Sequence, residues 1–283
     1  MRFVLLLSFL ILAAQPAFAA EKESAYDRVM RTGTFRCGYY PWPPYFNLDV
    51  STHKVTGLAV DVADAIGGLL GLKVEYVQMS AIGMSAEDMK KGLYDSYCLD
   101  SYYTFSSIKY LDFSDPHFYA PVFAYVRAGD KRFHTLADLN KPDITFVGID
   151  GDISVEMVQR RFPKAKIHSL PANSDGTQLM MDVLTKKADA TVIDPGIIEG
   201  FNAHNPPGLQ LIAPDDPVAV YPIGFSVLKG EDKLLHTING AISALQNTGA
   251  MKSIVERYNL VGKGIYLVAK PYEVPRPTES HKP

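Results

Sequence analysis

Short hydrophobic runs alternate with amphipathic segments along most of the chain, which is the pattern of an α/β protein. The pattern predicts strands over residues 34–38, 73–78, 95–99, 122–127, 144–149, 166–169, 191–193 and 222–228. It predicts helices over residues 25–31, 58–69, 86–91, 135–139, 154–162, 175–186, 197–203, 233–246 and 249–258. Because most predicted strands are followed by a helix, we expect sheets built from strand–helix–strand units.

A proline-rich aromatic loop follows the first predicted strand. Prolines 41, 43 and 44 end that strand, since proline cannot extend a hydrogen-bonded ladder. The loop carries the aromatic residues Tyr39, Tyr40, Trp42, Tyr45 and Phe46. Their side chains could fill a core or line the mouth of a cleft. We favour the core for Phe46 and a ligand contact for Trp42, because prolines on both sides hold Trp42 in a loop.

Two segments share one plan, which predicts two similar lobes. Residues 89–100 and 184–194 each contain a helix end, a Lys-Lys pair, an aspartate, a hydrophobic strand and a final aspartate. The final aspartates are Asp100 and Asp194. Ligands of open α/β sheets bind beyond the carboxyl ends of the strands. If the lobes face each other, Asp100, Asp194, residues 39–45 and residues 150–154 line one cleft.

The first 19 residues have the pattern of an export signal. Arg2 is followed by an apolar run over residues 3–14, which is too short to span a membrane comfortably, and then by the small–x–small sequence of residues 17–19. We expect cleavage near Ala20 and a soluble periplasmic protein. No cysteine follows the cleavage point, so we do not expect a lipid anchor.

Composition and motifs exclude several function classes. The net charge is −3, and no basic block indicates nucleic-acid binding. The chain has no metal-spaced His/Cys cluster, no glycine-rich phosphate loop and no nucleophile elbow, so we expect no metal, no cofactor and no enzyme activity. Asp100 and Asp194 could form an acid/base pair, but two carboxylates in a binding cleft need no catalytic role.

The chain has two cysteines, Cys37 and Cys98, both in predicted strands of the first lobe. In an oxidising compartment such a pair is a candidate disulfide. Directly paired strand residues fit disulfide geometry poorly. Two buried thiols therefore remain the alternative.

Four segments in order carry a resemblance to a known family: residues 57–63, 112–116, 188–194 and 247–254. With them the chain resembles the bacterial extracellular solute-binding proteins of family 3, the periplasmic binding proteins of polar amino acid uptake. The resemblance covers nearly all of residues 32–258. It implies a monomer that closes on its ligand by hinge motion and delivers it to the permease of an ABC-type transporter.

The resemblance also implies a type II two-lobe fold. Lobe one would comprise residues 20–127 and 222–262, and lobe two residues 128–221, with a proline-rich tail over residues 263–283. Two crossing strands, near residues 122–127 and 222–228, would join the lobes.

Site residues carry over unevenly from the family. Trp42 matches the aromatic residue over the ligand, and Asp194 matches the acid that binds the ligand's ammonium group. Where the family has an arginine that grips the ligand carboxylate, this chain has Ser107. Further departures lie where the family has small hydroxyl residues: Leu99, Asp100 and Tyr102 at a strand end, and Asp152 and Ile153 at a helix start.

These departures suggest that a carboxylate receptor is missing. Anionic groups near Asp100, Asp152 and Asp194 would be repelled. A cationic or neutral polar ligand fits better, with aromatic faces from Tyr40, Trp42, Tyr45 and Tyr102. Two alternatives stay open: Asp152 only caps its helix while Asp100 is solvated, or the protein is a sensing or partner-binding module that takes no part in transport.

Overall fold

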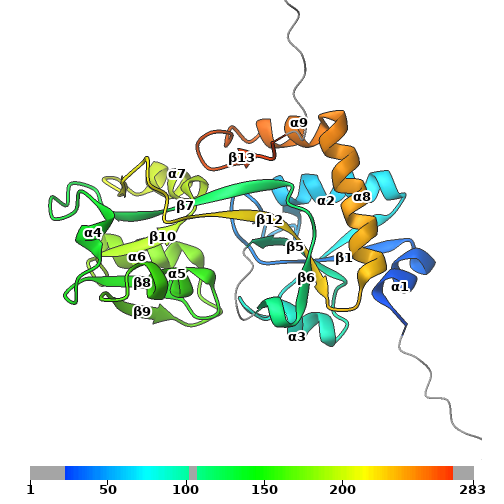
Figure 1. Cartoon of the computed structure of the whole chain (residues 1–283), viewed down its shortest axis with the longest axis horizontal. Coiled ribbons are helices and arrows are strands. Elements are labelled where there is room, and N and C mark those ends of the chain that lie inside the picture. The colour runs from blue at the N-terminus through cyan, green and yellow to red at the C-terminus, as the bar shows by residue number, and fades with distance from the viewer. Residues whose placement is uncertain (1–22, 102–106, 270–283) are drawn as a thin grey trace, which may run out of the picture.

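The computed structural model describes residues 23–101 and 107–269. The predicted export signal and most of the proline-rich tail lie outside these residues. The described chain forms two lobes, which two long strands join (Figure 1). These strands are β7 (Phe118–Arg127) and β12 (Ala219–Leu228). The expected mixed α/β fold is confirmed.

Lobe one contains both ends of the described chain. Its elements before β7 are α1 (Ala25–Thr32), β1 (Thr34–Tyr39), β2 (Asn47–Leu48), β3 (Val55–Thr56), α2 (Leu58–Leu70), β4 (Lys73–Gln78), α3 (Ser85–Lys90), β5 (Ser96–Ser101), the 3-10 helix η1 (Ser107–Lys109) and β6 (Leu111–Phe113). Its elements after β12 are α8 (Asp232–Thr248), α9 (Ala250–Glu256) and β13 (Tyr266–Leu267).

Lobe two is built from the segment between the two long strands. Its elements are α4 (Leu136–Leu139), β8 (Thr145–Ile149), α5 (Ile153–Arg161), β9 (Lys166–Leu170), α6 (Gly176–Leu184), β10 (Ala190–Ile193), α7 (Pro195–His204) and β11 (Leu209–Ile212). Separate hydrophobic clusters pack on the two faces of its sheet, one around Phe146 and Phe162 and the other around Leu179 and Phe201.

One continuous sheet runs through both lobes in the order β4-β1-β5-β12-β7-β10-β8-β9, with β6, β11 and β13 paired to its central strands, while β2 and β3 form a separate two-stranded sheet. β7 changes partners along its length: Phe118 to Val122 pair with β12, and Phe123 to Val126 pair with β10. β12 returns antiparallel to β7 and then pairs with β5 and β6 in lobe one. Both long strands begin before the predicted crossing segments, at Phe118 and Ala219.

Some short strands were not predicted from the sequence. Residues 111–113, for which no strand was predicted, form β6 and pair with Val227 and its neighbours in β12. β11 and the hairpin of β2 and β3 were also missed. These strands have two to four residues each, too few for an alternating pattern to show. Pairing with longer or adjacent strands stabilises them instead.

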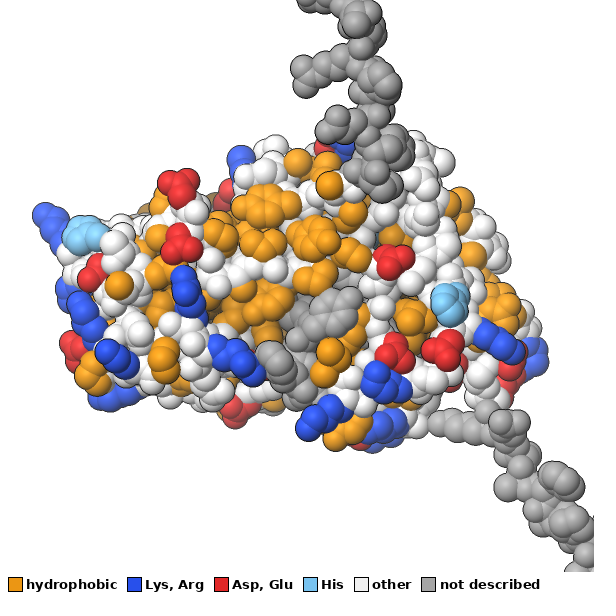
Figure 2. All heavy atoms as spheres, in the orientation of Figure 1, with side chains coloured by type: hydrophobic (Ala, Val, Ile, Leu, Met, Phe, Trp, Pro, Cys, Tyr) orange, Lys and Arg blue, Asp and Glu red, His pale blue; other side chains and the backbone are white. Residues whose placement is uncertain are grey.

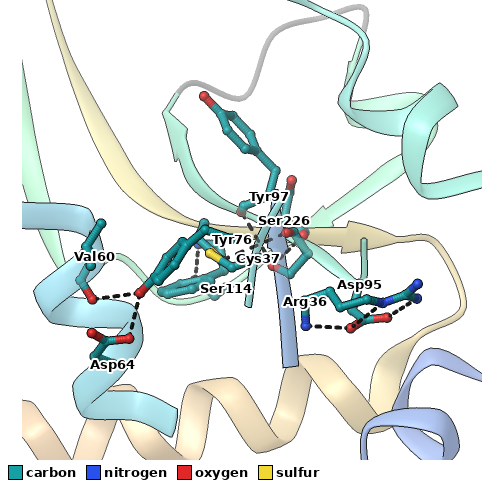
Figure 3. Close-up of a disulfide and its surroundings, with 12 residues drawn as sticks. Arg36, Cys37, Val60, Asp64, Tyr76, Asp95, Tyr97, Ser114 and Ser226 are labelled. Atoms are coloured by element: carbon teal, nitrogen blue, oxygen red, sulfur yellow. Dashed lines mark hydrogen bonds and ion pairs between the residues drawn. A yellow bond between two sulfur atoms is a disulfide. The ribbon is translucent and has the colours of Figure 1, made fainter. Parts of the chain in front are cut away.

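Cys37 in β1 and Cys98 in β5 form a disulfide beneath the sheet of lobe one (Figure 3). The parallel register places Cys37 opposite Ser96, so Cys98 lies two residues further along β5. This diagonal offset brings the two Cα atoms to 5.7 Å, within the usual range for a disulfide. The alternative of two free thiols does not hold in this structure. In Figure 3 the ring of Tyr97 points away from the disulfide.

Candidate ligand-binding cleft

A cavity of about 280 Å³ lies between the lobes. Lobe one contributes the loop after β1, the segment from Met79 to Glu87 and the end of β5; lobe two contributes the starts of α5 and α7. The strand ends of both lobes therefore meet at one site, as the internal similarity predicts. Figure 2 shows hydrophobic side chains gathered along the junction of the lobes on the face in view.

Two aromatic residues of the β1 loop reach across to lobe two. The Tyr40 hydroxyl donates a hydrogen bond to the carbonyl oxygen of Ser174, at 3.1 Å. The indole of Trp42 packs directly on Gly176, the first residue of α6: a Cβ built there would lie 2.6 Å from the ring. Both residues line the cavity. Phe46, by contrast, is fully buried in the core of lobe one, as expected.

Tyr45 belongs to both the core and the cleft. Its ring is 3 % exposed and stacks on Phe118, with ring centroids 6.3 Å apart. Its hydroxyl is buried and has no hydrogen-bond partner among the described residues, yet the residue lines the cavity. Burial raises the pKa of Tyr45 well above its usual value, and the negative charge of Asp194 acts in the same direction. The hydroxyl therefore stays protonated and has hydrogen-bonding capacity to offer a ligand.

Asp194 is the buried carboxylate of the cleft. It follows β10 and precedes Pro195, which is the first residue of α7. Its side chain is 5 % exposed, lines the cavity and makes no capping hydrogen bond to α7. A carboxylate in this position can receive the ammonium group of a ligand, and the low local dielectric strengthens such a contact.

Asp152 caps its own helix, which is one part of the first alternative given above; the other part, a solvated Asp100, lies outside what the structure describes. Its carboxylate accepts a hydrogen bond from the Ser154 backbone N–H at 2.8 Å, at the start of α5. Burial raises the pKa of Asp152, while hydrogen bonds from Ser154 and from the backbone of Ile153 act in the opposite direction. Asp152 and Ile153 both line the cavity.

The remaining predicted residues are only partly placed. Leu99 and Ser107 line the cavity. Asp100 lies in β5, where it pairs with Gly224 of β12, but its side chain is outside what the structure describes. Tyr102 lies wholly outside the described residues.

The charged residues that the structure places in the cavity wall are all acidic: Glu87, Asp152 and Asp194. Glu87 lies at the exposed rim and forms an ion pair with Lys90 at 2.9 Å. The Lys90 ammonium also lies over the ring of Tyr110, 4.5 Å from its centroid. Within residues 23–101 and 107–269, no group of three or more His, Cys, Asp or Glu could hold a metal ion.

The lobes touch on one side of the cavity through backbone atoms that sequence reasoning missed. The Ile82 N–H donates to the carbonyl oxygen of Ala172 at 3.1 Å. Next to it, Gly83 and Gly151 lie so close that a Cβ on either would be 3.0 Å from a backbone oxygen across the cleft. Only the glycines themselves could have pointed to this contact.

A second contact closes the other side of the cavity. A Cβ built on Gly196 of α7 would lie 3.2 Å from the Leu260 side chain and 3.6 Å from Pro44. With the bonds of Tyr40 and Ile82, this contact joins the two lobes next to the cavity. Across the described part of the chain, no helix has the length and apolar character to cross a membrane.

Comparison with known proteins identifies the family of this chain. A sequence model of the bacterial extracellular solute-binding proteins, family 3, matches residues 35–261. A probable amino-acid ABC transporter-binding protein of Haemophilus influenzae is 25 % identical over 81 % of this chain and 85 % of its own length. An L-arginine-binding protein of Pseudomonas aeruginosa is 24 % identical over 86 % of this chain and 90 % of its own length.

Two solved structures with a similar fold are also amino acid-binding proteins. An ancestral amino acid-binding protein, described as a precursor of cyclohexadienyl dehydratase, has a TM-score of 0.72 and 26 % identity, covering 83 % of this chain and 99 % of its own. An ancestral arginine-binding protein bound to arginine has a TM-score of 0.68 and 25 % identity, covering 80 % and 98 %.

Proposed function

The chain belongs to the bacterial extracellular solute-binding proteins, family 3, and we propose that it captures a small polar ligand by closing its lobes and delivers that ligand to an ABC-type uptake transporter. The observation that carries the proposal is the cavity between the two lobes. Residues of both lobes form its wall, so the wall is complete only when the lobes meet. A ligand in the cavity would bridge the lobes and stabilise the closed state.

A cationic ligand suits the charges in the wall. The acidic residues of the cavity attract cations, and the indole of Trp42 offers an aromatic face that favours them. The relatives named for arginine binding have ligands of this charge. In this proposal Asp194 receives the positive group of the ligand, and Tyr40, Trp42 and Tyr45 surround it.

The transport role gives the expected location and partner. The family is extracellular, and the segment over residues 1–19 has the pattern of a signal for export to the periplasm. There the closed, ligand-loaded monomer would dock on the permease of an ABC transporter. The role is binding rather than catalysis, because shape and charge in the cleft account for capture without a reaction.

A thermal-shift screen of the mature protein tests the proposal. The panel contains amino acids, polyamines, quaternary amines, opines and sugars. A ligand raises the melting temperature in step with the ratio of its concentration to its dissociation constant. A dose-dependent rise with a cationic compound, lost in Asp194→Asn and Trp42→Ala, is the expected result. If no compound shifts the melting temperature, the transport role fails and a sensing or partner-binding role takes its place.

A further inference from the structure

The described wall of the cleft has no positively charged side chain to bind a carboxylate. A buried carboxylate is bound most strongly by a cationic side chain, and N–H or hydroxyl donors add weaker contacts. Among the described residues of the wall there is no lysine, arginine or histidine. Lys90 at the rim already pairs with Glu87 and lies over Tyr110.

The helix start that faces the cavity already holds a carboxylate. α5 is nine residues long, and the backbone N–H of Ser154 near its start donates to Asp152 at 2.8 Å. The Asp152 side chain therefore occupies the place where a ligand's carboxylate would find a donor. A second carboxylate at this end of the cavity would displace Asp152 or be repelled by it.

Two polar groups of the wall suit an amine with an apolar body. Asp194 is a buried carboxylate. Tyr45 is 3 % exposed, and its hydroxyl, which has no hydrogen-bond partner among the described residues, is a buried polar group still to be satisfied. Satisfying such a group is worth more than an exposed contact, because an unmade bond in a buried site is costly. The hydrophobic part of the wall includes Met79, Leu111, Met157, Leu179 and Val192.

We infer that the cleft selects an organic amine that carries no carboxylate, with its ammonium group at Asp194 and its hydrocarbon body against the apolar wall. Asp152 then acts as a built-in substitute for the carboxylate of an amino acid. The inference rests on the proposed binding function and specifies its ligand class.

Matched pairs of compounds that differ only in a carboxylate test the inference. The pairs are 2-phenylethylamine with phenylalanine, 3-methylbutylamine with leucine, and agmatine with arginine. Isothermal titration calorimetry on the mature protein measures each dissociation constant. In the pair that binds, we expect the amine to bind at least about tenfold more tightly than the amino acid.

Substitution of Asp152 supplies the second measurement. Asp152→Ser removes the carboxylate from the start of α5 but keeps a residue that can cap a helix. The preference for the amine should shrink by about tenfold in this variant. Asp175→Ser is the matched control: Asp175 caps α6 through the Thr177 N–H at 2.6 Å and does not line the cavity. It should leave the preference unchanged, and circular dichroism checks that both variants fold.

Each outcome has a definite consequence. An amine preference that shrinks in Asp152→Ser alone supports the inference. Equal or tighter binding of the amino acids overturns it and leaves the proposed binding function intact. Binding of an opine, a sugar or an amino acid from the wider panel, with no binding of any amine that lacks a carboxylate, also overturns it. If nothing in the pairs or in the wider panel binds, the proposed function and the inference both fail.

Discussion

Gly83 of lobe one and Gly151 of lobe two meet backbone to backbone across the cleft. A Cβ on Gly83 would lie 3.0 Å from the carbonyl oxygen of Gly151, and a Cβ on Gly151 would lie 3.0 Å from that of Ile82. Both glycines have positive φ, +78° and +82°. Next to them the Ile82 N–H bonds to Ala172. A side chain here would hold the lobes apart, so closure depends on its absence.

Gly83→Ala should therefore weaken ligand binding by favouring the open state. The added methyl group is closer to a backbone oxygen than ordinary contacts allow, and the lobes must separate slightly to admit it. The apparent dissociation constant should rise by about three- to tenfold, because less of the protein is competent to close. Calorimetry measures the affinity, and small-angle X-ray scattering measures the radius of gyration with and without ligand.

Gly92→Ala is the control for that experiment. Gly92 also has positive φ, +74°, but a Cβ there meets nothing within 4 Å. Both substitutions carry the cost of placing alanine in the left-handed region, and only Gly83→Ala obstructs the cleft. Equal affinities in the two variants would show that the contact between Gly83 and Gly151 does not limit closure.

Asp194→Asn should lower ligand affinity strongly. The side chain keeps its size but loses the charge that attracts a cation in a buried site. A loss of about 2–5 kcal/mol is typical for one partner of a buried charged pair, which corresponds to more than about tenfold in the dissociation constant. Asp216→Asn, on the exposed surface of lobe two, changes the net charge equally and should have no such effect. A ligand that binds both variants alike would contradict the role of Asp194.

The sequence predicts the fold well because the hydrophobic pattern of each strand or helix depends only on residues that are close together in the chain. Ile144 to Ile149 read as a strand from their own hydrophobicity, and the structure has β8 over nearly the same residues. Asp194 could be placed at a strand end in the same way. The role of Asp152 could not be decided, since a helix cap and a ligand contact require the same residue at the same position.

Contacts between the lobes were beyond prediction for a different reason. Gly176 lies under Trp42, and Ser174 accepts the Tyr40 hydrogen bond, although more than 130 residues separate the partners. Which residues meet depends on how two rigid lobes are oriented, and periodicity carries no information on that. Tyr45 shows the same limit: its stacking on Phe118 makes it a core residue, while its hydroxyl belongs to the cleft.

The disulfide should stabilise lobe one. Cys37 and Cys98 are 61 residues apart in sequence, and closing a loop of that length restricts the unfolded chain by about 4 kcal/mol in the chain-entropy account. We expect Cys98→Ser to lower the free energy of unfolding by about 2–4 kcal/mol. Urea denaturation measures the change, and reduction of the wild-type protein with a thiol should reproduce it. A reduced protein as stable as the oxidised one would contradict this.

Acid should destabilise the protein through His117. Its ring packs edge-on against Phe118 and Phe225, the residue is 1 % exposed, and neither ring nitrogen has a hydrogen-bond partner within the part of the chain that the structure describes. Burial lowers its pKa to about 3. In the unfolded state the imidazole of His117 has a pKa of about 6.5, so it binds a proton at a pH where the folded protein keeps it neutral. The free energy of unfolding therefore decreases as the pH falls below about 6.5.

The expected size of this effect is about 2 kcal/mol between pH 8 and pH 5, from the difference between the folded and unfolded pKa values of His117. Urea denaturation across this pH range should show the fall in the wild-type protein and a smaller fall in His117→Leu. The comparison concerns the pH dependence, so a uniform change in stability from repacking does not affect it. His134→Leu, at an exposed position, should keep the wild-type pH dependence. If His117→Leu loses as much stability in acid as the wild type does, other groups cause the loss and the buried neutral imidazole is not its source.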